Sequence, residues 1–227
     1  IMRKNFENLV VEKPWGYEYI IYKNKDLCIT YLNINKDQST SLHCHPNKKT
    51  GYVVLSGTTE VQLGFYNTET FSAPSKVTIR PGLFHSTKAI SDNPAEVLEL
   101  ETPVDKNDIV RFNDQYGREN LNYEANSNIK NIDKNYKVFQ DPDFDKPQIY
   151  KYKGVEVKLE KNKNLKELCS KSFDTIIAVL EGGIRCPKTK KVVLSPGEVI
   201  KTGTIVKLAQ IFETNEYIKT LSVRRLD

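Results

Sequence analysis

Short β-prone segments, separated by turn residues, fill the first hundred residues and limit the folds open to this chain. The segments are rich in Ile, Val, Leu and Tyr, and Pro, Gly, Asn or Asp stands between them. About eight short strands at such regular spacing are typical of a β-barrel or jelly roll. We predict strands near residues 18–22, 27–34, 41–57, 60–65, 76–80, 86–90 and 95–101.

All three histidines of the chain fall within this series of segments. His43 and His45 are two residues apart, so a strand would project both imidazoles from one face and Cys44 from the other. His85 follows a turn at Pro81 and Gly82. Two half-buried histidines without a metal are one interpretation of the pair. The third histidine favours a divalent metal site of His43, His45 and His85, and zinc, manganese, iron and nickel all stay open.

These positions resemble the two sequence motifs of the cupin family. The matching residues are His43, His45 and Gly57 in the first motif, and Pro81, Gly82 and His85 in the second. The chain departs from the pattern at Thr50, where the family motif has a glutamate. The resemblance implies a three-histidine site in which Thr50 is at best a weak or water-mediated partner.

A narrower resemblance covers residues 10–118. Residues 13–16 read Lys-Pro-Trp-Gly, which is similar to the Arg-Pro-Trp-Gly opening of the type II phosphomannose isomerase domain. Residues 98–101, 107–111 and 114–118 resemble the end of that domain. The chain departs from it at His43, where that family has Gln, and at residues 48–52. The resemblance implies a metal-dependent sugar or sugar-phosphate isomerase of carbohydrate and surface-polysaccharide metabolism.

An isomerase whose histidines all bind metal needs another proton carrier. Glu99 and Glu101 alternate with two leucines, so either the leucines pack a core beside solvated glutamates or the glutamates line a polar pocket. In a pocket, both glutamates are candidate bases. The resemblance suggests phosphate binding or acid catalysis for Arg118. Further candidates for binding an anionic substrate are Lys48, Lys49, Arg80 and Arg111.

Three other functions fit the same histidines. A nucleotide-sugar epimerase would use a histidine as base without a metal. A three-histidine non-heme iron dioxygenase would leave coordination positions open for oxygen. A non-catalytic sugar-binding protein with two cupin barrels would have the pocket without turnover.

The second half repeats two segments of the first half in the same order. Residues 54–57 recur as 179–182, and residues 76–82 recur as 191–197. We therefore predict an all-β chain of two cupin barrels (double-stranded β-helices, or jelly rolls) in tandem, with the second degenerate. Leu168, Ser170 and Ile200 stand where the histidines would be, so the second barrel should bind no metal. The expected domains are 1–119, a linker at 120–147 and 148–227, although residues 164–172 also fit a short helix.

Charge and cysteine content narrow the function classes. The net charge of +5 comes from 34 basic and 29 acidic residues spread along the chain, unlike the clustered footprint of a nucleic-acid-binding protein. The four cysteines form no Cys-x-x-Cys pair, which favours free thiols in a reducing compartment. We see no signal peptide and no apolar run long enough for a membrane span. The expected protein is cytoplasmic and acts on a small sugar, with a homodimer as the family-level expectation.

Overall fold

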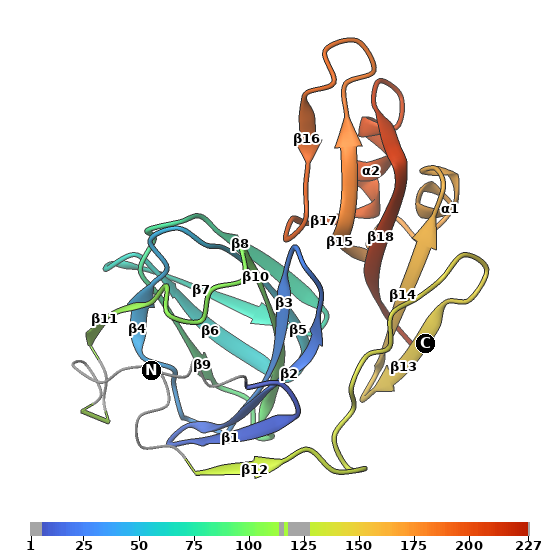
Figure 1. The fold of residues 1–227 in the computed structure, drawn as a ribbon. Coiled ribbons are helices and arrows are strands. Elements are labelled where there is room, and N and C mark those ends of the chain that lie inside the picture. The colour runs from blue at the N-terminus through green and yellow to red at the C-terminus, as the bar shows by residue number, and fades with distance from the viewer. Residues whose placement is uncertain (1–5, 114–115, 118–127, 227) are drawn as a thin grey trace.

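The computed structural model describes residues 6–113, 116–117 and 128–226, and its regular structure is almost entirely β (Figure 1). The described helices are α1 (Lys166–Cys169) and α2 (Thr202–Leu208). The all-β class predicted from the sequence is confirmed. Helix α1 also confirms the short helix predicted within residues 164–172.

Two facing antiparallel sheets make up the first half of the chain (Figure 1). The larger sheet has the spatial order β12 (Ile129–Asn131), β1 (Leu9–Lys13), β2 (Gly16–Lys23), β3 (Cys28–Ile34), β10 (Ala95–Thr102), β5 (Lys49–Ser56) and β8 (Ser75–Ile79). The smaller sheet has the order β11 (Val110–Asn113), β4 (Leu42–Cys44), β9 (His85–Ala89), β6 (Thr58–Leu63) and β7 (Asn67–Ser72). This arrangement is the jelly roll that the strand spacing predicted.

The central strands of the larger sheet are buried on both faces. In β10, Val97 points into the space between the two sheets, whereas Leu98 and Leu100 point to the opposite face. In β5, Val54 points inward and Val53 outward. Because side chains alternate along a strand, one nearly continuous apolar run supplies two separate cores. The inner core fills the barrel, and the outer core receives the second half of the chain.

The second half forms one open antiparallel sheet, and the second barrel predicted from the repeat is not seen among the described residues. Its order is β13 (Gln148–Tyr152), β14 (Val155–Asn162), β18 (Glu213–Arg225), β15 (Ile176–Arg185) and β16 (Val192–Leu194), with β17 (Val199–Lys201) also paired to β15. One face of this sheet packs against α1 and α2, and the other face packs against the first half. The helices cover one face of this sheet and the first half of the chain covers the other. Neither face is left for a second sheet that would close a barrel.

The repeat reproduces local turns without reproducing the fold. Gly57 and Gly182 both have a left-handed backbone, with φ of 78° and 75°. Gly82 and Gly197 share that region, with φ of 75° and 84°. Glycine is favoured at such positions because it has no Cβ. The repeated residues thus specify similar turns. Whether the strands close into a barrel depends on residues that are not repeated.

One apolar core joins the two halves. It combines Leu98 and Leu100 of β10 with Leu159 of β14 and Leu221 of β18, all fully buried. Gly51 of β5 allows a close approach, since a Cβ there would lie 2.5 Å from a methyl carbon of Val199. Part of the predicted linker also belongs to the first half, because β12 pairs with β1.

We expect Leu221→Ala to lower the free energy of unfolding by about 2–5 kcal/mol, because it removes a buried side chain from this shared core. Both halves should still unfold in one transition, which circular dichroism during chemical denaturation would measure. Ile211→Ala is the control, since that side chain is exposed and its loss should change stability by about 0.5 kcal/mol or less. Two separate transitions in the native protein would contradict a shared core.

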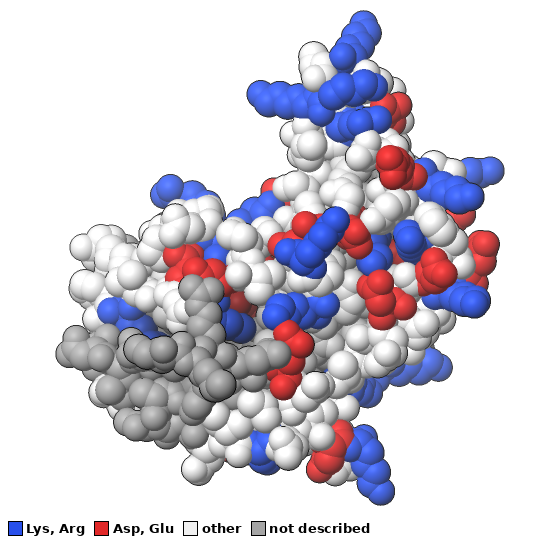
Figure 2. Space-filling model, in the orientation of Figure 1, with Lys and Arg blue, Asp and Glu red and all other residues white. Residues whose placement is uncertain are grey.

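The visible surface carries charges of both signs. Figure 2 shows basic and acidic side chains interspersed over most of this face, as the mixed composition indicated. Basic side chains gather at the far end of the second half, where the turn between β15 and β16 contains Lys188, Lys190 and Lys191.

Candidate metal centre and pocket

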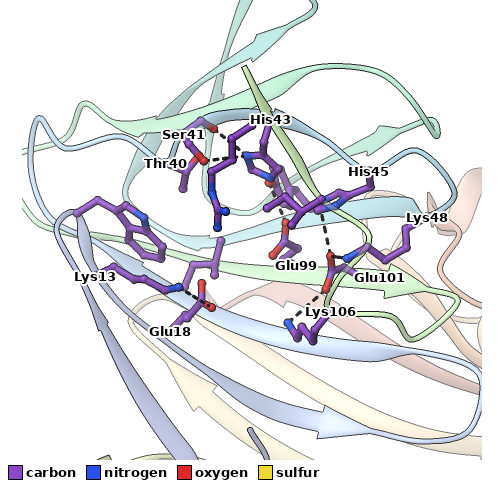
Figure 3. Close-up of a pocket in the computed structure, with 15 residues that line it drawn as sticks. Lys13, Glu18, Thr40, Ser41, His43, His45, Lys48, Glu99, Glu101 and Lys106 are labelled. Atoms are coloured by element: carbon purple, nitrogen blue, oxygen red, sulfur yellow. Dashed lines mark hydrogen bonds and ion pairs between the residues drawn. The ribbon is translucent and has the colours of Figure 1, made fainter. Parts of the chain in front are cut away.

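Three buried histidines meet between the two sheets of the barrel, and Figure 3 shows two of them, His43 and His45. His43 lies on β4 and pairs directly with His85 on β9, and His45 follows two residues after His43. The ring centroids are 4.5 Å apart for His43 and His85, and 5.0 Å apart for His43 and His45. One ligand atom from each histidine and one carboxylate oxygen of Glu99 all lie within 4.8 Å of one another.

Backbone carbonyls fix the orientation of each imidazole. The Nδ1 atoms of His43 and His85 lie 2.8 and 2.9 Å from the carbonyl oxygens of Ser41 and Leu83. His45 Nδ1 lies 2.7 Å from the carbonyl oxygen of Asp108. A carbonyl oxygen can only accept a hydrogen bond, so each Nδ1 carries the proton and each Nε2 keeps a free lone pair.

These histidines have the properties of metal ligands. Burial lowers the pKa of His43 and His85 to about 3 and that of His45 to about 4, so all three are neutral at pH 7. The Nε2 atoms of His45 and His85 are buried and accept no hydrogen bond from the described part of the chain. Buried polar atoms normally have a partner. A divalent cation bound by the imidazoles and a carboxylate would be the partner of these Nε2 atoms. The donor set therefore fits a metal ion.

Glu99 supplies the carboxylate that the cupin motif places at Thr50. It projects inward from β10, and the Tyr52 hydroxyl donates a 3.0 Å hydrogen bond to it. Burial and the neighbouring Glu101 raise the pKa of Glu99 to about 8. The sequence suggested Glu99 as a proton-transferring base, whereas its place in the cluster makes it a candidate ligand.

Glu101 lies beside the cluster between two lysines. Lys48 Nζ donates a hydrogen bond to its Oε1 atom, and Lys106 Nζ lies 3.3 Å from its Oε2 atom. Burial alone would raise the pKa of Glu101, but Lys106, Lys48 and His45 hold it well below its usual range. Glu101 is therefore an ionised carboxylate at neutral pH, and His45 Nε2 lies 3.5 Å from its Oε1 atom.

The rest of the pocket adds charged and aromatic groups. Lys13 and Glu18 form a 3.3 Å ion pair and are both largely buried. Trp15, part of the inner core, forms another section of the wall. Arg111 lies opposite His43 in the pairing of β11 with β4, and it also lines the pocket.

Two of the four predicted anion contacts line this pocket, namely Lys48 and Arg111. The other two do not. Lys49 points to the opposite face of β5, where its Nζ atom lies 2.6 Å from Glu198 of the second half, and Arg80 is exposed outside the pocket. Arg118, predicted as catalytic, lies outside the described residues.

Among the charged and aromatic residues that line the pocket, sequence reasoning missed Lys13, Glu18, Tyr52 and Lys106. The alternation of side chains along a strand was a usable signal for Tyr52. Tyr52 is two positions from Thr50 and four from Lys48, so all three point to the inward face. Lys106 lies in a loop, and the sequence has no comparable periodic signal for its direction.

Two facing antiparallel sheets that enclose a histidine cluster define the first half as a cupin domain. A sequence comparison indicates which family this domain resembles. Residues 3–114 match the family model described as mannose-6-phosphate isomerase C-terminal. The first half of the chain is therefore similar to the cupin domain of this family, as its motifs indicated.

Curated relatives match about half of the chain. The xanthan biosynthesis protein XanB of Xanthomonas campestris pv. campestris (strain B100) is 29% identical over 111 residues, which are 48% of this chain and 23% of XanB. Mannose-1-phosphate guanylyltransferase of Klebsiella pneumoniae is 27% identical over 113 residues, with the same two shares. The alginate biosynthesis protein AlgA of Pseudomonas putida is 25% identical over 127 residues, or 55% of this chain and 26% of AlgA. The matched region thus spans about a quarter of these proteins.

Solved structures with some likeness are smaller and more distant in sequence. KdgF from Halomonas sp. is 17% identical, with a TM-score of 0.38, and the match covers 41% of this chain and 84% of KdgF. A putative sugar phosphate isomerase from Acidithiobacillus ferrooxidans is also 17% identical, with a TM-score of 0.33 and coverage of 35% and 52%.

Membrane-spanning helices are not found in the described part of the chain, where both helices are too short to cross a bilayer.

Metal affinity should rise with pH because of Glu99. Below its pKa of about 8 this carboxyl carries a proton, which a metal ion must displace. We expect about tenfold tighter binding for each pH unit between 6 and 7.5, and a plateau above about 8.5. The histidines add no dependence in this range, because their pKa values of about 3 to 4 leave them already deprotonated. Calorimetric titration with Mn²⁺ at several pH values would measure the slope, and Glu99→Gln should flatten it. An equal slope in that variant would contradict the assignment.

Proposed function

We propose that this protein is a metal-dependent isomerase of sugar phosphates. One observation carries the proposal: a metal-suited cluster and a separate ionised carboxylate, Glu101, share one buried pocket. Interconversion of an aldose and a ketose needs a proton moved between adjacent carbons and a polarised oxygen. The pocket offers a group for each requirement.

His43, His45, His85 and Glu99 would hold the metal ion. A bound divalent ion would act as a Lewis acid on the carbonyl or hydroxyl oxygens of the sugar. The chain itself positions these ligands through carbonyls and through the Tyr52 hydroxyl.

Glu101 is the proposed proton carrier. As a carboxylate it can accept the proton from one sugar carbon and return it to the neighbouring carbon. Lys48 and Lys106 hold it in one orientation from two sides. Glu99 is less suited to this role, because it would be bound to the metal.

The charge of the pocket favours a phosphorylated sugar over a neutral one. Its walls carry the cationic side chains Lys13, Lys48, Lys106 and Arg111 and the acidic side chains Glu18, Glu99 and Glu101, while the histidines are neutral. Cationic groups are in excess before the metal ion is counted. A net positive pocket attracts ligands of the opposite sign, and Arg111 is the proposed phosphate contact.

The relatives support a place in polysaccharide metabolism. XanB and AlgA are described as xanthan and alginate biosynthesis proteins. Their similarity covers about half of this chain and about a quarter of each relative, so we propose for this protein the supply of a phosphorylated sugar precursor.

A panel of substrates tests the proposal. Protein loaded with Mn²⁺, Zn²⁺, Ni²⁺ or Fe²⁺ would be incubated with aldose and ketose 6-phosphates, mannose 6-phosphate among them, and with the corresponding free sugars. We expect interconversion of a phosphorylated pair and at least tenfold lower kcat/KM for the free sugars. Binding without turnover across the panel would favour a sugar-binding protein. Oxygen uptake with the Fe²⁺ form would favour a dioxygenase.

A further inference from the structure

His45 differs from the other two histidines in how its orientation is fixed. His43 and His85 donate to carbonyls two residues earlier on their own segments, so the local backbone orients them. His45 donates to the carbonyl of Asp108, which is 63 residues away in sequence. The loop that contains Asp108 must therefore be held in place if His45 is to keep its tautomer.

The Asp108 side chain provides this restraint. Its carboxylate accepts hydrogen bonds from the backbone N–H groups of Asn47 and Lys48, at 3.0 and 2.8 Å, and from the Asn47 amide at 2.9 Å. Residues 45–48 connect β4 to β5, and this segment begins with His45 and ends with Lys48. Burial alone would raise the pKa of Asp108, but the hydrogen bonds from Asn47 and Lys48 lower it, so it accepts them as a carboxylate.

We propose that Asp108 is a positioning residue that couples the metal ligand His45 to Lys48. Its carbonyl sets the imidazole of His45, and its carboxylate sets the backbone from which Lys48 reaches Glu101. The segment 107–111 joins the smaller sheet through Arg111, which pairs with His43. In the sequence, residues 107–111 were notable only for their resemblance to the end of the isomerase domain. The contacts of Asp108 show what this segment does in the structure: it orients His45 and the backbone at Lys48.

The coupling predicts effects at two places from one substitution. Asp108→Ala removes three hydrogen bonds from the turn at 46–48 and frees the loop whose carbonyl orients His45. We expect Mn²⁺ affinity to fall by about 10- to 100-fold, the range seen when outer partners of metal ligands are removed. In the metal-free protein, the ¹⁵N signals of His45 should shift toward a mixture of tautomers, whereas those of His43 and His85 should stay unchanged.

Asp105→Ala is the matched control. Asp105 belongs to the same loop and caps the Asn107 N–H at 2.9 Å, but it is exposed. Its loss should change Mn²⁺ affinity less than twofold and leave the His45 signals in place. Asp108→Asn, which keeps an acceptor oxygen for the Lys48 N–H, should recover most of the affinity and serves as the readout where Asp108→Ala does not fold.

The metal part of this inference rests on the proposed function, whereas the imidazole readout does not. Unchanged His45 signals and unchanged Mn²⁺ affinity in folded Asp108→Ala would overturn the inference. A native protein that binds no Mn²⁺ would overturn the proposed function, and the ¹⁵N spectra of the metal-free proteins would still decide the role of Asp108.

Discussion

Replacing His43 and His45 together with alanine should abolish stoichiometric metal binding. The two imidazoles supply half of the four ligands, and their Nε2 atoms face the same point as His85 and Glu99. Loss of direct ligands should exceed the 10- to 100-fold effect typical of outer partners, so we expect affinity for Mn²⁺ or Zn²⁺ to fall by more than about 100-fold. Elemental analysis after dialysis, together with calorimetric titration, would measure the change.

Cys44→Ala is the control for this double variant. Cys44 is the last residue of β4 and lies between the two histidines in sequence, and side-chain alternation points it to the other face. It should retain metal at the native level. Equal metal content in the native protein and in His43→Ala/His45→Ala would contradict the site.

Replacing Glu101 with glutamine should lower kcat by about 10²- to 10⁴-fold while the metal stays bound. Glutamine keeps the shape of the side chain but cannot accept the substrate proton. The metal ligands are unchanged, so Mn²⁺ content should match that of the native protein. Kinetic assay of the interconverted sugar phosphates, with metal analysis of the same sample, separates the loss of chemistry from the loss of the ion.

Glu96→Gln is the matched control for Glu101. Glu96 lies on the same strand, β10, but its parity places it on the outer face with Leu98 and Leu100. It should leave kcat within about twofold. Because Glu101→Gln leaves Lys48 and Lys106 beside a neutral amide, its melting temperature would be measured as well. A folded, metal-loaded Glu101→Gln protein with native kcat would exclude this residue as the proton carrier.

Strand parity explains which parts of the site were predictable. The spacing of His43 and His45 fixed their common face, and the Pro-Gly turn located the third histidine. For Glu99 and Glu101 the sequence left two arrangements open, and the structure has both leucines in a core and both glutamates in the pocket. The alternatives were not exclusive, because the second half of the chain packs on the outer face of β10. No local sequence pattern predicts that the two faces of one strand pack against different parts of the chain.

The same outer face accounts for Lys49 and for the second half. Lys49 shares parity with Val53 and Leu55, and it meets Glu198 across the interface between the halves. Its partner is about 150 residues away, so no local reading of the sequence could find it. The repeated Gly182 and Gly197 specify turns. The choice between a closed barrel and an open sheet depends instead on which surfaces cover the sheet, and here the barrel itself covers one of them.

Deuterium incorporation tests the central claim most directly. Metal-loaded protein would be incubated in D₂O with the aldose and ketose 6-phosphates, and the sugar carbons would be followed by NMR. Proton transfer through Glu101 predicts deuterium at C1 of the ketose or C2 of the aldose, in the native protein only. It should be absent from Glu101→Gln and from His43→Ala/His45→Ala. Stoichiometric metal with neither interconversion nor deuterium in any of these sugars would contradict an isomerase.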